Sequence, residues 1–126
     1  STKTIIPQYA SDIEPNNSFQ YATQLNNGVE ACGQIGFNND TNRHDNEDWY
    51  IIQLNSTTAN ISLIPIDATG SIRVTLIDST ASNSLTSAYG NENIITCQRE
   101  KLEMGTYYIK VSANGNTYGC YSLKVN

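Results

Sequence analysis

Residues 45–54 read DNEDWYIIQL, and they join an acidic cluster to an alternating apolar segment. In an extended chain, successive side chains point to opposite faces. One face here would carry Tyr50, Ile52 and Leu54, and the other would carry Trp49, Ile51 and Gln53. Period two with aromatic and β-branched residues predicts a strand that begins at Trp49 and buries one face.

The same alternation recurs along the chain, with turn-forming residues between the segments. The apolar sets are Ile61 and Leu63; Ile72, Val74 and Leu76; Tyr107, Ile109 and Val111; and Tyr121, Leu123 and Val125. Many short strands with frequent turns predict an all-β protein, an antiparallel β-sandwich. The last two sets, separated by ANGN, are expected to pair as a hairpin.

The N-terminal region departs from this pattern. In SFQYATQL (18–25), Phe19, Ala22 and Leu25 recur at three-residue spacing, which predicts one short helical turn behind an Asn17 or Ser18 cap. Residues 1–11 are interpreted as a linker or an edge segment, and residues 12–126 as one β-sandwich domain.

Composition limits the classes of function. The net charge is −5 and the pI is about 4.6, which argues against a nucleic-acid partner. No stretch approaches the length of a membrane span, so no membrane partner is expected. A polar surface rich in Asn, Ser and Thr, with only 15% charged residues, is common in secreted proteins. The chain opens with STKTIIPQYA, which is not a signal peptide; if the protein is exported, we expect a mature fragment or an internal domain.

Six of the twelve acidic residues lie in two short windows, residues 12–14 and 40–48. Asp12 and Glu14 would point the same way in an extended segment, and Pro15 favours that geometry. Carboxylates this close repel one another unless a cation lies between them. Calcium takes six to eight oxygen ligands of the kinds found here, although the spacing is not that of an EF-hand. The alternative interpretation is two solvated loops.

Four motifs stand in a characteristic order. The first is EPNNS (14–18), followed by Ala22, and the second is GQI (33–35). The third is DNEDWY (45–50), and the fourth is GTYYIKV (105–111), preceded by Leu102. A predicted strand, YSLKV (121–125), follows them. From Asp12 to the C-terminus, this order resembles the bacterial pre-peptidase C-terminal domain, an accessory module of secreted proteases that include the clostridial collagenases.

The resemblance implies a jelly-roll-like β-sandwich and a calcium site. Carried over by position, the site comprises Glu14, Asn16, Asn17, Asp45 and Asp48, with Asp12 where some members have a second acid. Asn17 stands where calcium-binding members often have Asp, and calcium affinity depends on ligand charge. A site held by hydrogen bonds from Asn17, with no calcium, is the alternative.

The sequence predicts no enzyme. It has neither G-x-S-x-G nor H-E-x-x-H, and its single histidine, His44, falls in the acidic loop. The resemblance implies instead a secreted or cell-surface accessory domain that helps a parent enzyme to bind its substrate or a surface. Collagen, other proteins and polysaccharides are the candidate partners. A structural spacer without a ligand, or a carbohydrate-binding module, is the alternative.

Exposed aromatic rings would serve such binding, because they stack on sugars and anchor interfaces. Trp49, Tyr89, Tyr108 and Tyr118 are the expected outward-facing rings, although each could equally cover a sheet edge or pack under a loop.

Alternation also places Cys32 and Cys120 on outward faces and Cys97 inward. The expected arrangement is a Cys32–Cys120 disulfide with a buried free thiol at Cys97.

Overall fold

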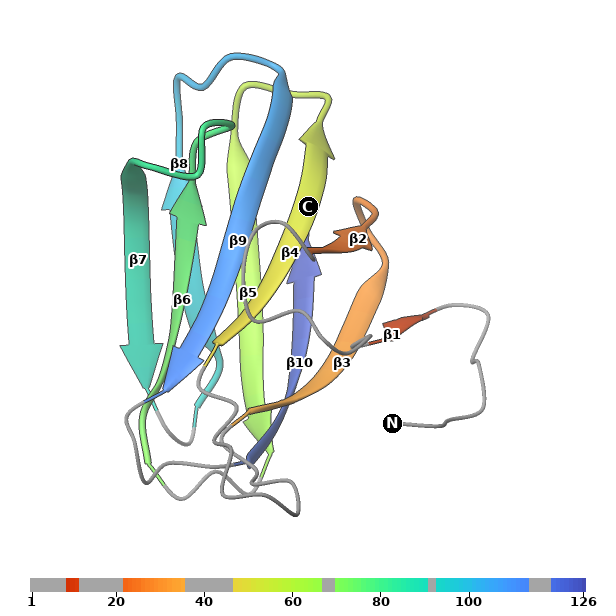
Figure 1. Ribbon diagram of the computed structural model, residues 1–126, viewed down its shortest axis with the longest axis vertical. Coiled ribbons are helices and arrows are strands. Elements are labelled where there is room, and N and C mark those ends of the chain that lie inside the picture. The colour runs from red at the N-terminus through yellow and green to blue at the C-terminus, as the bar shows by residue number, and fades with distance from the viewer. Residues whose placement is uncertain (1–8, 12–21, 36–46, 67–69, 91–92, 114–118) are drawn as a thin grey trace.

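The chain folds into two facing β-sheets, as the ribbon of the computed structural model shows (Figure 1). The structure describes residues 9–11, 22–35, 47–66, 70–90, 93–113 and 119–126, and the account below is confined to them. No helix occurs among these residues, and so none is long and apolar enough to cross a membrane. The predicted β-sandwich is confirmed.

Sheet A has the strand order β1-β3-β10-β5-β8. Its strands are β1 (Tyr9–Ser11), β3 (Glu30–Ile35), β10 (Gly119–Val125), β5 (Ala59–Ile66) and β8 (Ile95–Arg99). Sheet B has the order β2-β4-β9-β6-β7. Its strands are β2 (Thr23–Leu25), β4 (Glu47–Leu54), β9 (Gly105–Ala113), β6 (Ile72–Ile77) and β7 (Ser84–Gly90). The pairs are antiparallel except at the short edge strands, where β1 runs parallel to β3 and β2 parallel to β4.

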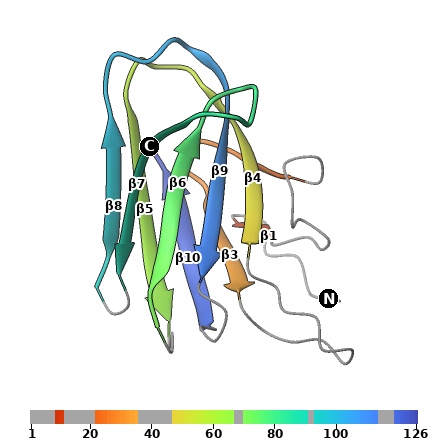
Figure 2. The same ribbon diagram turned by 60° about the vertical axis from the view of Figure 1, so that its left-hand side comes forward.

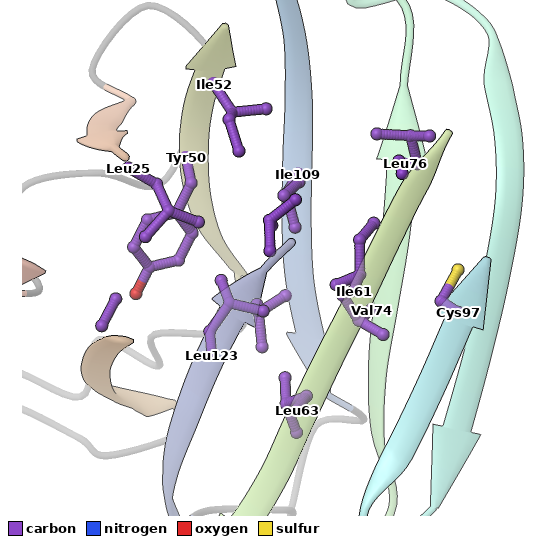
Figure 3. Packing of buried hydrophobic residues seen from close by; sticks show 14 of the residues in the cluster. Leu25, Tyr50, Ile52, Ile61, Leu63, Val74, Leu76, Cys97, Ile109 and Leu123 are labelled. Atoms are coloured by element: carbon purple, nitrogen blue, oxygen red, sulfur yellow. The ribbon is translucent and has the colours of Figure 1, made fainter. Parts of the chain in front are cut away.

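The core lies between the two sheets and is made of the alternating residues (Figure 3). Figure 3 labels Leu25, Tyr50, Ile52, Ile61, Leu63, Val74, Leu76, Cys97, Ile109 and Leu123, all buried. At the far edge from β1 and β2, strands β7 and β8 lie side by side and bring the two sheets together (Figure 2). The inward faces expected from period two are therefore the inward faces observed.

Two expectations about local structure are wrong. Strands β9 and β10 do not form a hairpin: β9 lies between β4 and β6 in sheet B, and β10 lies between β3 and β5 in sheet A. The predicted helical turn fails at its described end, because Thr23–Leu25 form β2, with Thr23 and Leu25 buried and Gln24 exposed. Residues 18–21 of that prediction lie outside the described part.

The turn between β6 and β7 is organised by one carboxylate, that of Asp78. Its Oδ1 accepts hydrogen bonds from the Thr80 hydroxyl at 2.7 Å and from the backbone N–H groups of Ser82 and Asn83. Its Oδ2 accepts a bond from Asn83 Nδ2 at 2.7 Å. Side-chain bonds from Asn83 and then Thr80, helped by the backbone bonds, lower the pKa of Asp78 from 3.8 to about 2.

A lowered pKa makes the turn sensitive to acid. Because the folded-state pKa lies below the unfolded value, Asp78 contributes stability above about pH 4 that is lost as the pH falls through about 2. We expect Asp78→Asn to remove this part of the pH dependence. Urea unfolding of both proteins between pH 2 and pH 5 measures it. Parallel stability profiles for wild type and variant would contradict the assignment.

Candidate functional site

Five of the six residues predicted to bind calcium lie outside the described residues; they are Asp12, Glu14, Asn16, Asn17 and Asp45. The sixth, Asp48, is described. Its strand begins earlier than predicted, at Glu47 and not at Trp49. Asp48 is therefore inside β4, on the same inward side as Tyr50, and its side chain is completely buried.

Two tyrosines form a buried chain of hydrogen bonds that ends on Asp48. The Tyr121 hydroxyl donates to Asp48 Oδ2 at 2.7 Å, and the hydroxyl oxygens of Tyr50 and Tyr121 are 2.6 Å apart. Since the single proton of Tyr121 is directed at the carboxylate, Tyr50 must be the donor in the second bond. The bonds therefore run from Tyr50 to Tyr121 to Asp48, and each polarises the next.

A glycine makes room for these rings. Gly33 in β3 lies opposite Tyr121 in β10, and its backbone faces the core. A Cβ at this position would lie 2.5 Å from both Cζ and Oη of Tyr121, and 2.9 Å from Oη of Tyr50. Distances under 3 Å are not tolerated between such atoms, so only glycine lets the two hydroxyl groups meet beneath the sheet.

This arrangement can hold a carboxylate in one position, in surroundings where its electrostatic interactions are strong. Within the described residues no group of three or more His, Cys, Asp or Glu side chains is close enough to hold a metal. A site with three such ligands that includes Asp48 would therefore draw on residues outside the described part.

Three of the four predicted ligand-binding aromatics share one surface, and Tyr118 lies outside the described residues. Trp49, Tyr89 and Tyr108 all point away from the core on sheet B. Their exposures differ. Tyr89 is 66% exposed, Tyr108 is half-buried, and only 8% of Trp49 is exposed, because Tyr108 packs edge-on against it at 6.1 Å and the Lys110 ammonium lies over its ring.

The three cysteines are free thiols in the structure. Cys97 is buried in the core, where burial raises its pKa. Cys32 and Cys120 lie on the outer face of sheet A in neighbouring strands, in diagonal positions: Cys32 pairs with Ser122 and Cys120 with Gln34. Burial is the main cause that raises the pKa of Cys32, and electrostatic repulsion from Glu30 and Cys120 raises it further. A disulfide between Cys32 and Cys120 remains a prediction.

Sequence reasoning did not find Tyr121, Tyr50 or Gly33 as parts of the site. The tyrosines were assigned to the core by alternation, and nothing in that pattern predicts that their hydroxyl groups meet. Gly33 did carry a signal. A glycine inside a strand often marks a close approach by another group, and here that group is a pair of tyrosine rings.

Comparison with known proteins identifies the fold. No family model matches the chain, and no curated protein matches it. Among solved structures, it is similar to the pre-peptidase C-terminal domain of a collagenase from Bacillus anthracis. The TM-score is 0.68 at 20% sequence identity, and the match covers 83% of this chain and 94% of that one. The chain thus has the fold of a pre-peptidase C-terminal domain, as its motifs predicted.

Proposed function

We propose that this protein is a non-catalytic accessory domain of a secreted bacterial protein, which binds calcium and helps a parent enzyme to bind its substrate or a surface. The observation that carries the proposal is the buried Asp48, placed where both acidic segments join the sandwich. The fold shared with an accessory domain of a collagenase supports the same role.

Strand pairing brings the described residues that flank the two acidic segments to one edge of the sandwich. The first, residues 12–21, leaves β1 beside β3 and reaches β2, where Thr23 lies next to Tyr50 of β4. The second, residues 36–46, leaves the end of β3 and reaches the start of β4. Both therefore connect the same two edge regions. Asp48 lies two residues before Tyr50, close to where each segment ends.

The donors fit calcium chemically. All six proposed ligands, Asp12, Glu14, Asn16, Asn17, Asp45 and Asp48, carry the carboxylate or amide oxygens that calcium prefers. A fully buried carboxylate is costly unless its charge is balanced. The Tyr121 hydroxyl supplies one hydrogen bond to Asp48, and a carboxylate can coordinate a cation in addition.

Bound calcium would supply a positive charge that ties the N-terminal segment to the sandwich. The chain's own residues fix the position of the Asp48 carboxylate that would hold the cation. Tyr121 orients Asp48, and Gly33 leaves space for the Tyr121 ring. With calcium bound, the N-terminal segment would be held against the sandwich. Such a constraint suits a module that holds a ligand-binding face at a fixed orientation.

Calcium removal should therefore lower stability. Calcium at about ten times its Kd would add about 1.4 kcal/mol to the free energy of unfolding, which corresponds to roughly 5 °C in melting temperature. Thermal melts with calcium and with excess EGTA measure this difference, and Glu14→Gln is expected to reduce it. Magnesium serves as the control cation. Identical melts under both conditions would rule out the calcium site.

A further inference from the structure

The outer face of sheet B carries two basic residues on neighbouring strands. Lys110 in β9 lies directly opposite Thr75 in β6, and Arg73 is two residues before Thr75 on the same strand. Arg73 and Lys110 therefore share this face as diagonal neighbours. Thr75 between them is almost completely buried.

Arg73 is held in a defined position. Its guanidinium carbon lies 5.1 Å from the centre of the Tyr89 ring, and its Nη1 donates to the Ser87 hydroxyl at 3.3 Å. A cation over an aromatic face is attracted by the ring's electrons. The planar guanidinium keeps further N–H donors in a fixed fork, which matches the two oxygens of a carboxylate.

Lys110 is placed in a similar way by a second ring. Its ammonium lies 5.6 Å from the centre of the Trp49 ring, which sits across from it on β4. The indole N–H of Trp49 donates to Glu47 Oε1 at 3.1 Å. Each of the two cations is thus supported by an aromatic ring on the same outer face. Tyr89 comes from β7 and Trp49 from β4, the strands that flank β6 and β9.

The charge of this face is opposite to that of the domain. Within the described part of the structure, neither Arg73 nor Lys110 forms an ion pair, and Glu47 is the acidic residue on this face. The protein as a whole has a net charge of −5. Two cations that form no ion pair leave this face able to attract an acidic ligand.

We propose that the outer face of sheet B binds an acidic polysaccharide, a glycan whose sugar rings carry carboxylate groups. Two carboxylates of the glycan contact the two cations, one at Arg73 and one at Lys110, and a sugar ring stacks on the exposed Tyr89. The hydroxyl groups of Ser87 and Ser112, which flank Arg73, provide hydrogen-bonding partners for sugar hydroxyls. This inference deepens the proposed docking role and rests on it.

An acidic peptide fits this surface less well. Peptides that add to a sheet do so at its edge, and protein interfaces are anchored by aromatic and arginine side chains that are fully desolvated in pockets. Of the exposed large apolar residues in the described part, only Tyr89 lies on this face. The others are Ile64, Ile66, Ile94 and Met104. A flat face of hydroxyl groups, two cations and one open ring suits a sugar chain better.

Titration calorimetry with a short oligogalacturonate tests the proposal. Its methyl-esterified counterpart has the same sugars without the charge, and oligoglutamate has the charge without the sugars. We expect the oligogalacturonate to bind and both control ligands to bind at least about tenfold more weakly. Arg73→Gln should weaken oligogalacturonate binding about tenfold or more, through loss of a charge-assisted contact.

Matched variants separate the site from a general charge effect. Lys124→Gln removes an exposed cation from the outer face of sheet A and should leave the affinity unchanged. Tyr89→Phe should bind normally, whereas Tyr89→Ala should not. Equal binding of the esterified sugar or of oligoglutamate, equal effects of Arg73→Gln and Lys124→Gln, or no binding at all would each overturn the proposal. None of these results would alter the calcium-dependent melt, so failure here is distinct from failure of the calcium site.

Discussion

Replacing Gly33 with alanine is expected to lower the free energy of unfolding by about 3 kcal/mol or more, at the upper end of the cost of overpacking a core. The added methyl carbon would lie 2.5 Å from Cζ and Oη of Tyr121. Tyr121 cannot simply move aside, because its hydroxyl is fixed between Tyr50 and Asp48 and its ring is fully buried. Either the strands separate or the hydrogen bonds break.

Gly90→Ala is the matched control. It also adds one methyl group to a strand glycine, but its Cβ would meet only the Ile95 side chain, with the nearest atom at 3.2 Å. A flexible aliphatic side chain can shift by the few tenths of an ångström that this requires. Urea denaturation of both variants measures the difference. If Gly33→Ala is no less stable than Gly90→Ala, Gly33 does not have the role assigned to it.

The double variant Gly33→Ala/Tyr121→Phe adds a further check. The two residues are in contact, so their effects should not add. Tyr121→Phe removes one of the two atoms that the new methyl group would meet at 2.5 Å, while the other, Cζ, remains. The double variant should therefore be more stable than the sum of the single effects predicts, yet less stable than Tyr121→Phe alone.

The faces of the strands could be predicted from the sequence, because period two is a local property of an extended chain. The pairing of strands could not be predicted in the same way. The short ANGN segment between β9 and β10 suggested a hairpin, but β9 is flanked by β4 and β6. A turn signal tells where the chain reverses and says nothing about which sheet receives the next strand.

The candidate site was partly predictable for a related reason. Asp48 was found as a member of an acidic cluster, and that reasoning placed it just before the strand. Its burial depends on Tyr121, which is 73 residues away in the sequence and in the opposite sheet. Contacts of this kind follow from the packing of the two sheets. The one sequence signal of the contact between Asp48 and the two tyrosines was Gly33, a glycine inside a strand.

Replacing Tyr121 with phenylalanine should destabilise the protein by about 1.5–3 kcal/mol, the range for a hydrogen bond to a charged group. The ring and its packing remain, and only the hydroxyl that donates to Asp48 Oδ2 at 2.7 Å is lost. Asp48 is completely buried, so water cannot readily replace this donor. The Tyr50 hydroxyl loses its acceptor at the same time. Chemical denaturation at neutral pH measures the loss.

Tyr50→Phe separates the charged bond from the neutral one. It removes the donor at the start of the chain but leaves Tyr121 bonded to Asp48, so we expect a smaller loss of about 1 kcal/mol. Equal losses for the two variants would show that the carboxylate does not depend on Tyr121.

Calcium adds a second comparison. If it balances the charge of Asp48 as proposed, Tyr121→Phe should cost less in calcium than in EGTA, because the cation then offsets part of the charge of the buried carboxylate. A cost that is the same in both conditions would separate Asp48 from the calcium site.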